Sequence, residues 1–175
     1  MLQVGCILNT FIRRADVVRI ACIAQLVNVI APIMTRPGGP AWRQTIYWPY
    51  FFASRYGRGT ALRLAVDCPG YAAAVADEVP WLDVAGVRDR TGAVTFFLVN
   101  RSGAEPLDLA LDLEGFGPLR LADHQLIRHD DLEATNTAER PDNVRPVPGT
   151  GAAVTDGRLS ASLPPYSWSM IRLTG

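Results

Sequence analysis

Two amide side chains interrupt an otherwise apolar stretch near the start of the chain. Gln25 and Asn28 lie within Ile20–Met34, a run that consists mainly of Ile, Val, Leu and Ala. A polar group inside such a run is costly unless it has a partner. These two positions are therefore the first places where the sequence indicates exposed chemistry.

Other residue types that carry chemistry lie in patterns that favour structural roles. His124 and His129 are five residues apart with no Cys or further His nearby, so we expect surface or strand-edge histidines and no metal site. The Pro37–Pro40 turn lacks the Lys-Ser/Thr of a phosphate-binding loop. We expect no cofactor. The glutamates all fall in the second half of the chain, at Glu78, Glu105, Glu114, Glu133 and Glu139.

The first 57 residues have the pattern of an α/β unit. Residues 1–15 carry apolar groups at helical spacing, and residues 17–24 read as a strand buried on both faces. Residues 42–56 predict a second helix, which Pro49 must either start or kink. A lone parallel strand has no neighbour to pair with. This part therefore resembles the end of something larger.

From about residue 58 the pattern changes to alternating strands. Seven strands with regular turn signals predict an antiparallel sandwich, at residues 61–67, 79–89, 92–100, 107–113, 118–127, 158–163 and 167–173. Residues 133–151, rich in Asn, Pro and Thr, predict a long ordered loop.

Composition excludes several classes of protein. The 175 residues carry 17 basic and 17 acidic side chains, a formal net charge of 0, which does not indicate binding to nucleic acid. No apolar run is long enough for a membrane span. The odd count of 3 Cys, without a CxxC motif, is typical of reduced thiols and indicates a cytoplasmic protein.

Several blocks of the sequence resemble one enzyme family. They are AQLVN and PGGPAWRQT in the first half, then VPWLDV, FFLVNRS, LEATNTAERPDNVRP and LPPYSWSMIRL. Together they resemble the α-L-arabinofuranosidases of glycoside hydrolase family fifty-one. The resemblance implies a mainly β fold: a C-terminal jelly-roll-like antiparallel β-sandwich over 58–175, preceded by a helix–strand–helix remnant of a (β/α)8 barrel over 1–57.

The resemblance also implies an activity and a missing part. Family members are retaining exo-enzymes that release terminal α-L-arabinofuranose from arabinan and arabinoxylan oligosaccharides. Retention requires two carboxyl groups about 5–5.5 Å apart. In the family both are glutamates of earlier barrel strands, and none of the glutamates here matches those motifs. We therefore assign no catalytic residue and expect a truncated chain that is inactive alone.

Two substrate-binding residues can be carried over from the family. Gln25 matches a glutamine that hydrogen-bonds the arabinose, although a structural core amide is the alternative. Trp42 could stack on a sugar face or pack at the barrel–sandwich junction. We expect Asn28 to form a loop, and Arg43 and Arg55 to form salt bridges or to cap a helix. Relatives are commonly homo-oligomers, so we expect the complete protein to be one.

The alternative function is a non-catalytic module, either a carbohydrate-binding sandwich or a structural buttress. A binding module would require exposed aromatic side chains, for which Trp81 and Trp168 are the candidates. The alternation of their strands indicates that both face inward. A purely structural role for the sandwich remains compatible with the enzyme hypothesis.

Overall fold

The computed structural model describes residues 1–74 and 76–175 as a mainly β protein with two helices. The helices are α1 (Leu2–Arg13) and α2 (Tyr47–Tyr56). The strands are β1 (Ile33–Thr35), β2 (Ala41–Arg43), β3 (Thr60–Leu62), β4 (Gly70–Ala73), β5 (Ala76–Pro80), β6 (Leu82–Arg88), β7 (Val94–Asn100), β8 (Leu107–Asp112), β9 (Arg120–Ile127), β10 (Val147–Pro148), β11 (Ala153–Thr155), β12 (Arg158–Leu163) and β13 (Ser167–Thr174).

Two antiparallel sheets form the body of the molecule. The larger has the strand order β10-β9-β13-β7-β6-β3, and the smaller has the order β11-β12-β8. Their facing side chains form one core cluster, which includes Phe96 and Leu98 of β7, Leu159 of β12 and Ile171 of β13. These sheets are the sandwich that the alternating pattern predicts.

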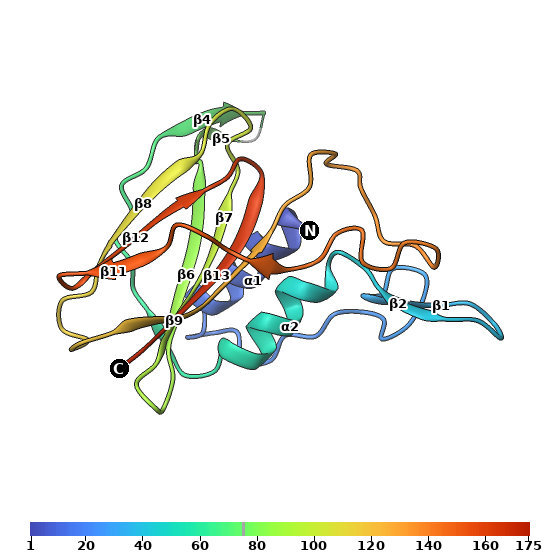
Figure 1. The fold of residues 1–175 in the computed structure, drawn as a ribbon, viewed down its shortest axis with the longest axis horizontal. Helices are drawn as coiled ribbons and strands as arrows, with labels where there is room; N and C mark the ends of the chain where they lie inside the picture. Colours follow the sequence, from blue (N-terminus) through green and yellow to red (C-terminus); the bar gives the residue numbers. More distant parts are fainter. Residues whose placement is uncertain (75) are drawn as a thin grey trace.

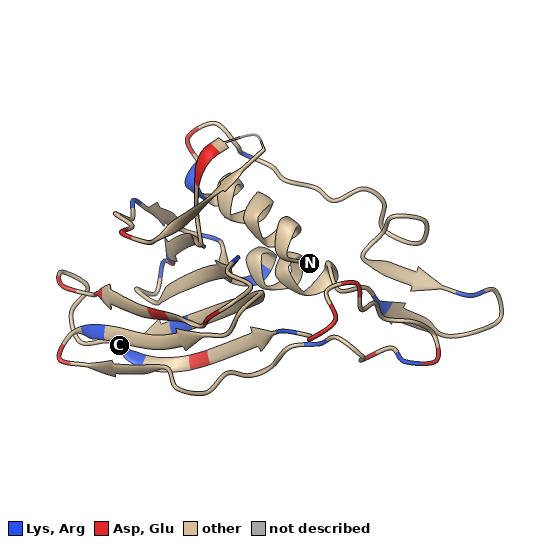
Figure 2. Cartoon of the chain, turned by 90° about the horizontal axis from the view of Figure 1, so that it is seen from above, with Lys and Arg blue, Asp and Glu red and all other residues tan. Residues whose placement is uncertain are grey.

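The two helices cover the other face of the larger sheet (Figures 1 and 2). A second core cluster lies there, formed by Phe97 and Val99 of β7, Trp168 and Met170 of β13, and Phe52 of α2 among others. Alternate residues of β7 thus belong to different clusters, and every residue of this strand is buried. The molecule therefore has three layers: a small sheet, a large sheet and a helical layer.

Gly5 allows α1 to lie close to the sheet. A Cβ at this position would be 2.7 Å from Trp168 Cδ1 and 3.0 Å from Val99 Cγ2. Phe52 of α2 stacks on the same Trp168 ring, with 5.6 Å between the ring centroids. Trp168, which is 1% exposed, therefore contacts both helices, and the prediction that it faces inward is confirmed. Trp81 is half-buried.

The structure differs from the sequence-based prediction in the first half of the chain. No strand forms over 17–24 within the described residues. A strand buried on both faces requires neighbours to satisfy its backbone groups, and residues 18–32 have none beyond one isolated bridge between Val27 and Ile33. The expected helix over 42–56 begins only at Tyr47, because Trp42 belongs to β2. Pro49 lies in the first turn of α2, where its missing N–H costs nothing.

The second half contains all seven predicted strands, together with the short strands β4, β5, β10 and β11, which the sequence analysis did not predict. The seven predicted strands appear as β3, β6, β7, β8, β9, β12 and β13. The first of these is shorter than expected, since residues 63–69 have no regular structure. His124 is a correction: it is 7% exposed on β9, between β10 and β13, and is not at a surface or sheet edge. No helix within the described residues is long and apolar enough to cross a membrane.

We predict that Gly5→Val lowers the free energy of unfolding by about 2 kcal/mol, because overpacking a close contact typically costs 1–3 kcal/mol. Urea unfolding followed by Trp fluorescence measures this change. Gln3→Val, at an exposed position of the same helix, is the control and should cost less than about 1 kcal/mol. Equal effects of the two substitutions would contradict the close packing of α1 on Trp168.

Candidate sugar-contacting segment

Gln25 lies in the segment that connects α1 to β1, and its side chain is exposed. The segment is anchored from α2, where the Tyr50 hydroxyl donates a hydrogen bond to the Ala21 carbonyl oxygen at 3.0 Å. The alternative role of Gln25 as a core amide does not agree with its exposure in this chain. The contact with arabinose stays a prediction.

Large apolar side chains surround Gln25 along the same segment and are also exposed. Ile20 is 83% exposed, Val29 is 81% exposed and Leu26 is 75% exposed. We call this set the apolar strip: Val17, Ile20, Leu26, Val27, Val29 and Ile30. Several large exposed apolar side chains in one segment indicate a place where another surface packs.

Asn28 forms the turn that follows Gln25. Its backbone N–H donates to the Ile33 carbonyl oxygen at 2.8 Å, and its Oδ1 accepts from the Thr35 N–H at 2.6 Å. Its φ of 66° is in the left-handed region, which Asn tolerates better than most residues. The prediction that Asn28 is a loop-former is confirmed.

Trp42 lies on β2 of the β1–β2 hairpin, opposite Met34. Val27 forms a bridge with Ile33 of β1, which in turn pairs with Arg43 of β2. Neighbouring strands are about 4.8 Å apart, so the backbone brings the segment of Gln25 to within about two strand spacings of Trp42. The Trp42 ring is half-buried, and its Nε1–H donates to the Asn136 carbonyl oxygen at 3.1 Å.

The long loop of residues 128–146 passes beside the β1–β2 hairpin (Figure 1). Asn136 of this loop fastens the two together. Its Nδ2 donates to the carbonyl oxygens of Arg43 at 2.8 Å and Val144 at 2.9 Å, and its Oδ1 accepts from the Val144 N–H at 2.7 Å. Gln44 also donates to the Asn136 carbonyl oxygen, at 3.2 Å. Asn136 is 2% exposed, so these bonds are shielded from water. The sequence analysis did not identify this residue.

Two carboxylates from neighbouring strands line a common cavity. Glu78 and Asp83 both line a cavity of about 440 Å³ next to α1. Asp83 accepts from Asn9 Nδ2 at 2.8 Å and forms an ion pair with Arg13 at 3.1 Å. Asn9 and Arg13 are four residues apart on one face of α1, a spacing that could have indicated a shared partner. These contacts tie α1 to β6 and give Asp83 a structural role.

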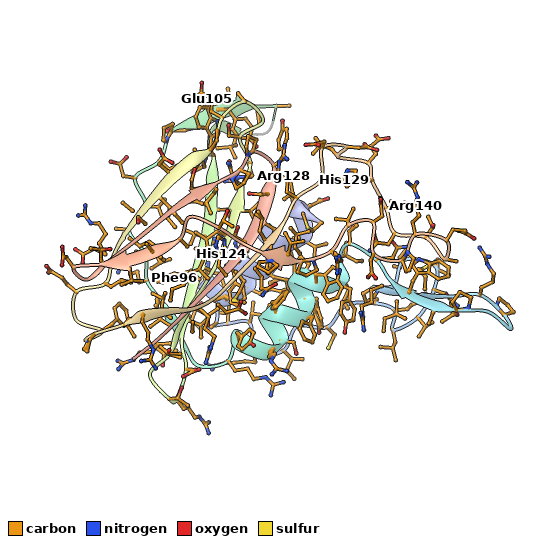
Figure 3. The ribbon with its side chains drawn as sticks, in the orientation of Figure 1. Phe96, Glu105, His124, Arg128, His129 and Arg140 are labelled. Atoms are coloured by element: carbon orange, nitrogen blue, oxygen red, sulfur yellow. The ribbon has the colours of Figure 1, made fainter. Side chains whose placement is uncertain are left out.

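The two histidines lie on β9 and in the loop after it, and Arg43 and Arg55 lie beside aromatic rings. Figure 3 shows His124 on the sheet and His129 in the loop that follows it. Burial lowers the pKa of His124, so its ring stays neutral near pH 7. The Arg43 guanidinium lies 5.2 Å from the centre of the Trp48 ring, and that of Arg55 lies 5.5 Å from Tyr56. Neither arginine forms an ion pair within the described residues, so the salt-bridge alternative is wrong. Arg55 lies in the last turn of α2, which agrees with the other alternative, a role at a helix end.

Comparisons with known proteins give one consistent result. The family described as α-L-arabinofuranosidase C-terminal domain matches residues 1–167. An intracellular exo-α-(1→5)-L-arabinofuranosidase from Halalkalibacterium halodurans is 44% identical over 98% of this chain and 34% of its own length. The enzyme of the same name from Streptomyces lividans is 46% identical over 96% of this chain and 25% of its own length.

Solved structures agree with the sequence comparisons. A family 51 α-L-arabinofuranosidase from Bifidobacterium longum matches 99% of this chain with a TM-score of 0.92 and 38% identity. The family 51 arabinofuranosidase from Xanthomonas axonopodis matches 95% with a TM-score of 0.85 and 29% identity. The chain spans about a third of the length of both structures, which are matched over 34% and 33%.

We predict that Asn136→Ala destabilises the chain by about 2 kcal/mol, because it leaves buried backbone groups of Val144 and Arg43 without partners. Amide hydrogen exchange should accelerate over residues 33–43 in this variant. Asn143→Ala removes a single, longer hydrogen bond to Thr135 at 3.2 Å and serves as the control. Unchanged exchange over the hairpin in Asn136→Ala would show that the hairpin is held by other contacts.

Proposed function

The chain belongs to the α-L-arabinofuranosidase C-terminal domain family, and on this premise we propose that it is the closing part of an exo-acting α-L-arabinofuranosidase. The complete enzyme would remove terminal α-L-arabinofuranosyl residues from arabinan and arabinoxylan oligosaccharides. The observation that carries the proposal is the match over 1–167 together with identities of 44% and 46% to named arabinofuranosidases.

Residues 1–57 would complete a (β/α)8 barrel, and residues 58–175 would form the sandwich beside it. The exposed apolar strip supports this division, because apolar side chains in water are unfavourable and a neighbouring barrel strand would cover them. The Gln25 side chain would then lie near the end of the last barrel strand, where barrel enzymes hold their substrates. There its amide would donate a hydrogen bond to an arabinose hydroxyl.

The bond-breaking carboxylates would come from the barrel portion outside these residues. Retaining hydrolysis needs a nucleophile and a separate acid/base. Asp83, which lines a cavity with Glu78, is already bound by Arg13 and Asn9. We therefore propose that the chain alone does not hydrolyse arabinofuranosides, and that its helices and hairpin position Gln25.

The setting of the complete protein follows from the same relatives. Two of them are named intracellular enzymes, and Cys6, Cys22 and Cys68 are all free thiols. We extend the cytoplasmic location to this protein, and we propose a homo-oligomer as its assembled state.

A chimeric enzyme tests the proposal. This chain replaces the matching third of the H. halodurans enzyme, and hydrolysis of an aryl α-L-arabinofuranoside is measured. We predict a kcat/KM within about tenfold of the parent enzyme, a loss of about 1.4 kcal/mol at most. Gln25→Ala in the chimera should lower kcat/KM by at least about tenfold, the value of one hydrogen bond to substrate. Gln3→Ala, another exposed glutamine, should leave kcat/KM unchanged.

Two outcomes would contradict this account. A folded chimera without activity would show that the chain cannot close an arabinofuranosidase barrel. Turnover of the same substrate by the pure 175-residue chain would show that it carries its own carboxyl pair. Glu78→Gln in that chain would then identify whether the cavity beside α1 is responsible.

A further inference from the structure

Four arginines from different parts of the chain line one open hollow of about 740 Å³. Arg55 is in the last turn of α2, and Arg58 follows that helix. Arg88 is the last residue of β6, and Arg90 is in the turn between β6 and β7. We call this feature the arginine hollow. It lies apart from Gln25 and Trp42, neither of which lines it.

The arginine hollow contains a single carboxylate, and that carboxylate is already neutralised. Asp89 forms an ion pair with Arg172 of β13 at 2.7 Å. Hydrogen bonds from Thr91, together with Arg172, lower the pKa of Asp89 from 3.8 to about 2, so the pair is fully charged at pH 7. The four lining arginines therefore contribute about four positive charges, and none of the four forms an ion pair within the part of the chain that the structure describes.

The side-chain contacts of these arginines leave their terminal nitrogens free. Within the described residues, Arg55 donates through Nε to the Tyr56 hydroxyl, and Arg58 donates through Nε to the Ser54 carbonyl oxygen. The Arg88 guanidinium lies 5.9 Å from the centre of the Phe116 ring. The Nη atoms, which form the fork that grips oxyanions, remain available on all four residues.

The backbone that carries the arginines is firmly held. Thr60 pairs with Arg88, and Gly59, with φ of 151°, lies so close to the Arg88 carbonyl that a Cβ would be 2.2 Å from its oxygen. The neighbouring turn is closed by Asp89, whose Oδ1 accepts from the N–H groups of Thr91 at 2.8 Å and Ala93 at 3.1 Å. The backbone at Arg88 and in the turn that contains Arg90 is thus held by its own contacts, which reduces the entropy lost on binding.

Like charges held together in this way repel each other, and the nearby end of α2 compensates only a small part of this charge. The C-terminal end of α2 contributes about half a negative charge, to which Arg58 is already bonded. A single carboxylate would neutralise one of four guanidinium groups. A phosphate ester brings about two charges and a pyrophosphate more, with several acceptor oxygens for Arg forks.

From this charge balance we propose that the arginine hollow binds a multiply charged oxyanion of the phosphate-ester class. The proposal is independent of the hydrolase function and does not involve the sugar-contacting segment. The ligand would be a phosphorylated small molecule whose charged group contacts the arginines that line the hollow.

Isothermal titration of the 175-residue chain with pyrophosphate tests the proposal. We expect a Kd of about 100 μM or tighter at an ionic strength of about 0.05 M, and a several-fold weakening at about 0.3 M because salt screens exposed charges. Arg58→Ala and Arg90→Ala should each weaken binding about tenfold, the value of a charge-assisted contact. Arg145→Ala removes an exposed arginine outside the hollow and should leave the Kd unchanged.

Further measurements separate this site from the alternatives. Both hollow residues are exposed, so an unchanged Tm in the two variants verifies that lost binding is not lost folding. Absence of heat with pyrophosphate, or equal weakening by Arg145→Ala, would overturn the proposal. Tighter binding of a galacturonate trimer than of pyrophosphate would also overturn it, because an acidic saccharide would then be the occupant.

Discussion

Burial of the larger sheet on both of its faces is the constraint on which the rest of the structure depends. Trp168 on β13 lies at its centre, in contact with Phe97 of β7 and Phe52 of α2 and beside the backbone at Gly5. An isolated two-sheet sandwich would leave this face in water, with a large loss of apolar burial. The helical layer is therefore part of the core of the sandwich. The packing of α1 and α2 on the sheet also holds the segments between and beside them in place.

This arrangement explains how the first 57 residues can hold their positions with little sheet of their own. The two helices are anchored by the sheet, by the Asp83–Arg13 ion pair and by stacking on Trp168. Asn136 fixes the β1–β2 hairpin to the long loop. Between these anchors the apolar strip and Gln25 are left exposed. The sandwich thus holds the two helices and the hairpin in place, whereas the apolar strip has no covering surface within the described residues.

The elements that could be predicted from the sequence are those whose burial leaves a local pattern. The elements that could not are those that depend on distant contacts. Strands β6 to β9, β12 and β13 were predictable because alternating burial leaves a period of two in the sequence. The strand expected over 17–24 did not form because its stability depends on neighbours that this chain does not provide. Trp42 was wrongly predicted to lie in a helix. It lies in the β1–β2 hairpin, which is stabilised by a contact with Asn136, 94 residues further along the chain. The helix or strand propensity of a short stretch does not predict a contact with a residue so far away in the sequence.

The candidate sites also differ in whether a local sequence pattern could reveal them. Gln25 could be chosen from its apolar surroundings and from the family resemblance, and the structure leaves it exposed as a ligand contact would require. The arginine hollow could not be found in this way, because its residues come from α2, the following turn, β6 and the β6–β7 turn. The pairing of β3 with β6 brings those segments together.

The most direct test of this account is native-state hydrogen exchange on the 175-residue chain. If the helical layer belongs to the core of the sandwich, amides of α1 and α2 should open with free energies within about 1 kcal/mol of those of β7 and β13, while residues 18–30 exchange rapidly. Rapid exchange throughout residues 1–57, beside a fully protected sheet, would contradict it.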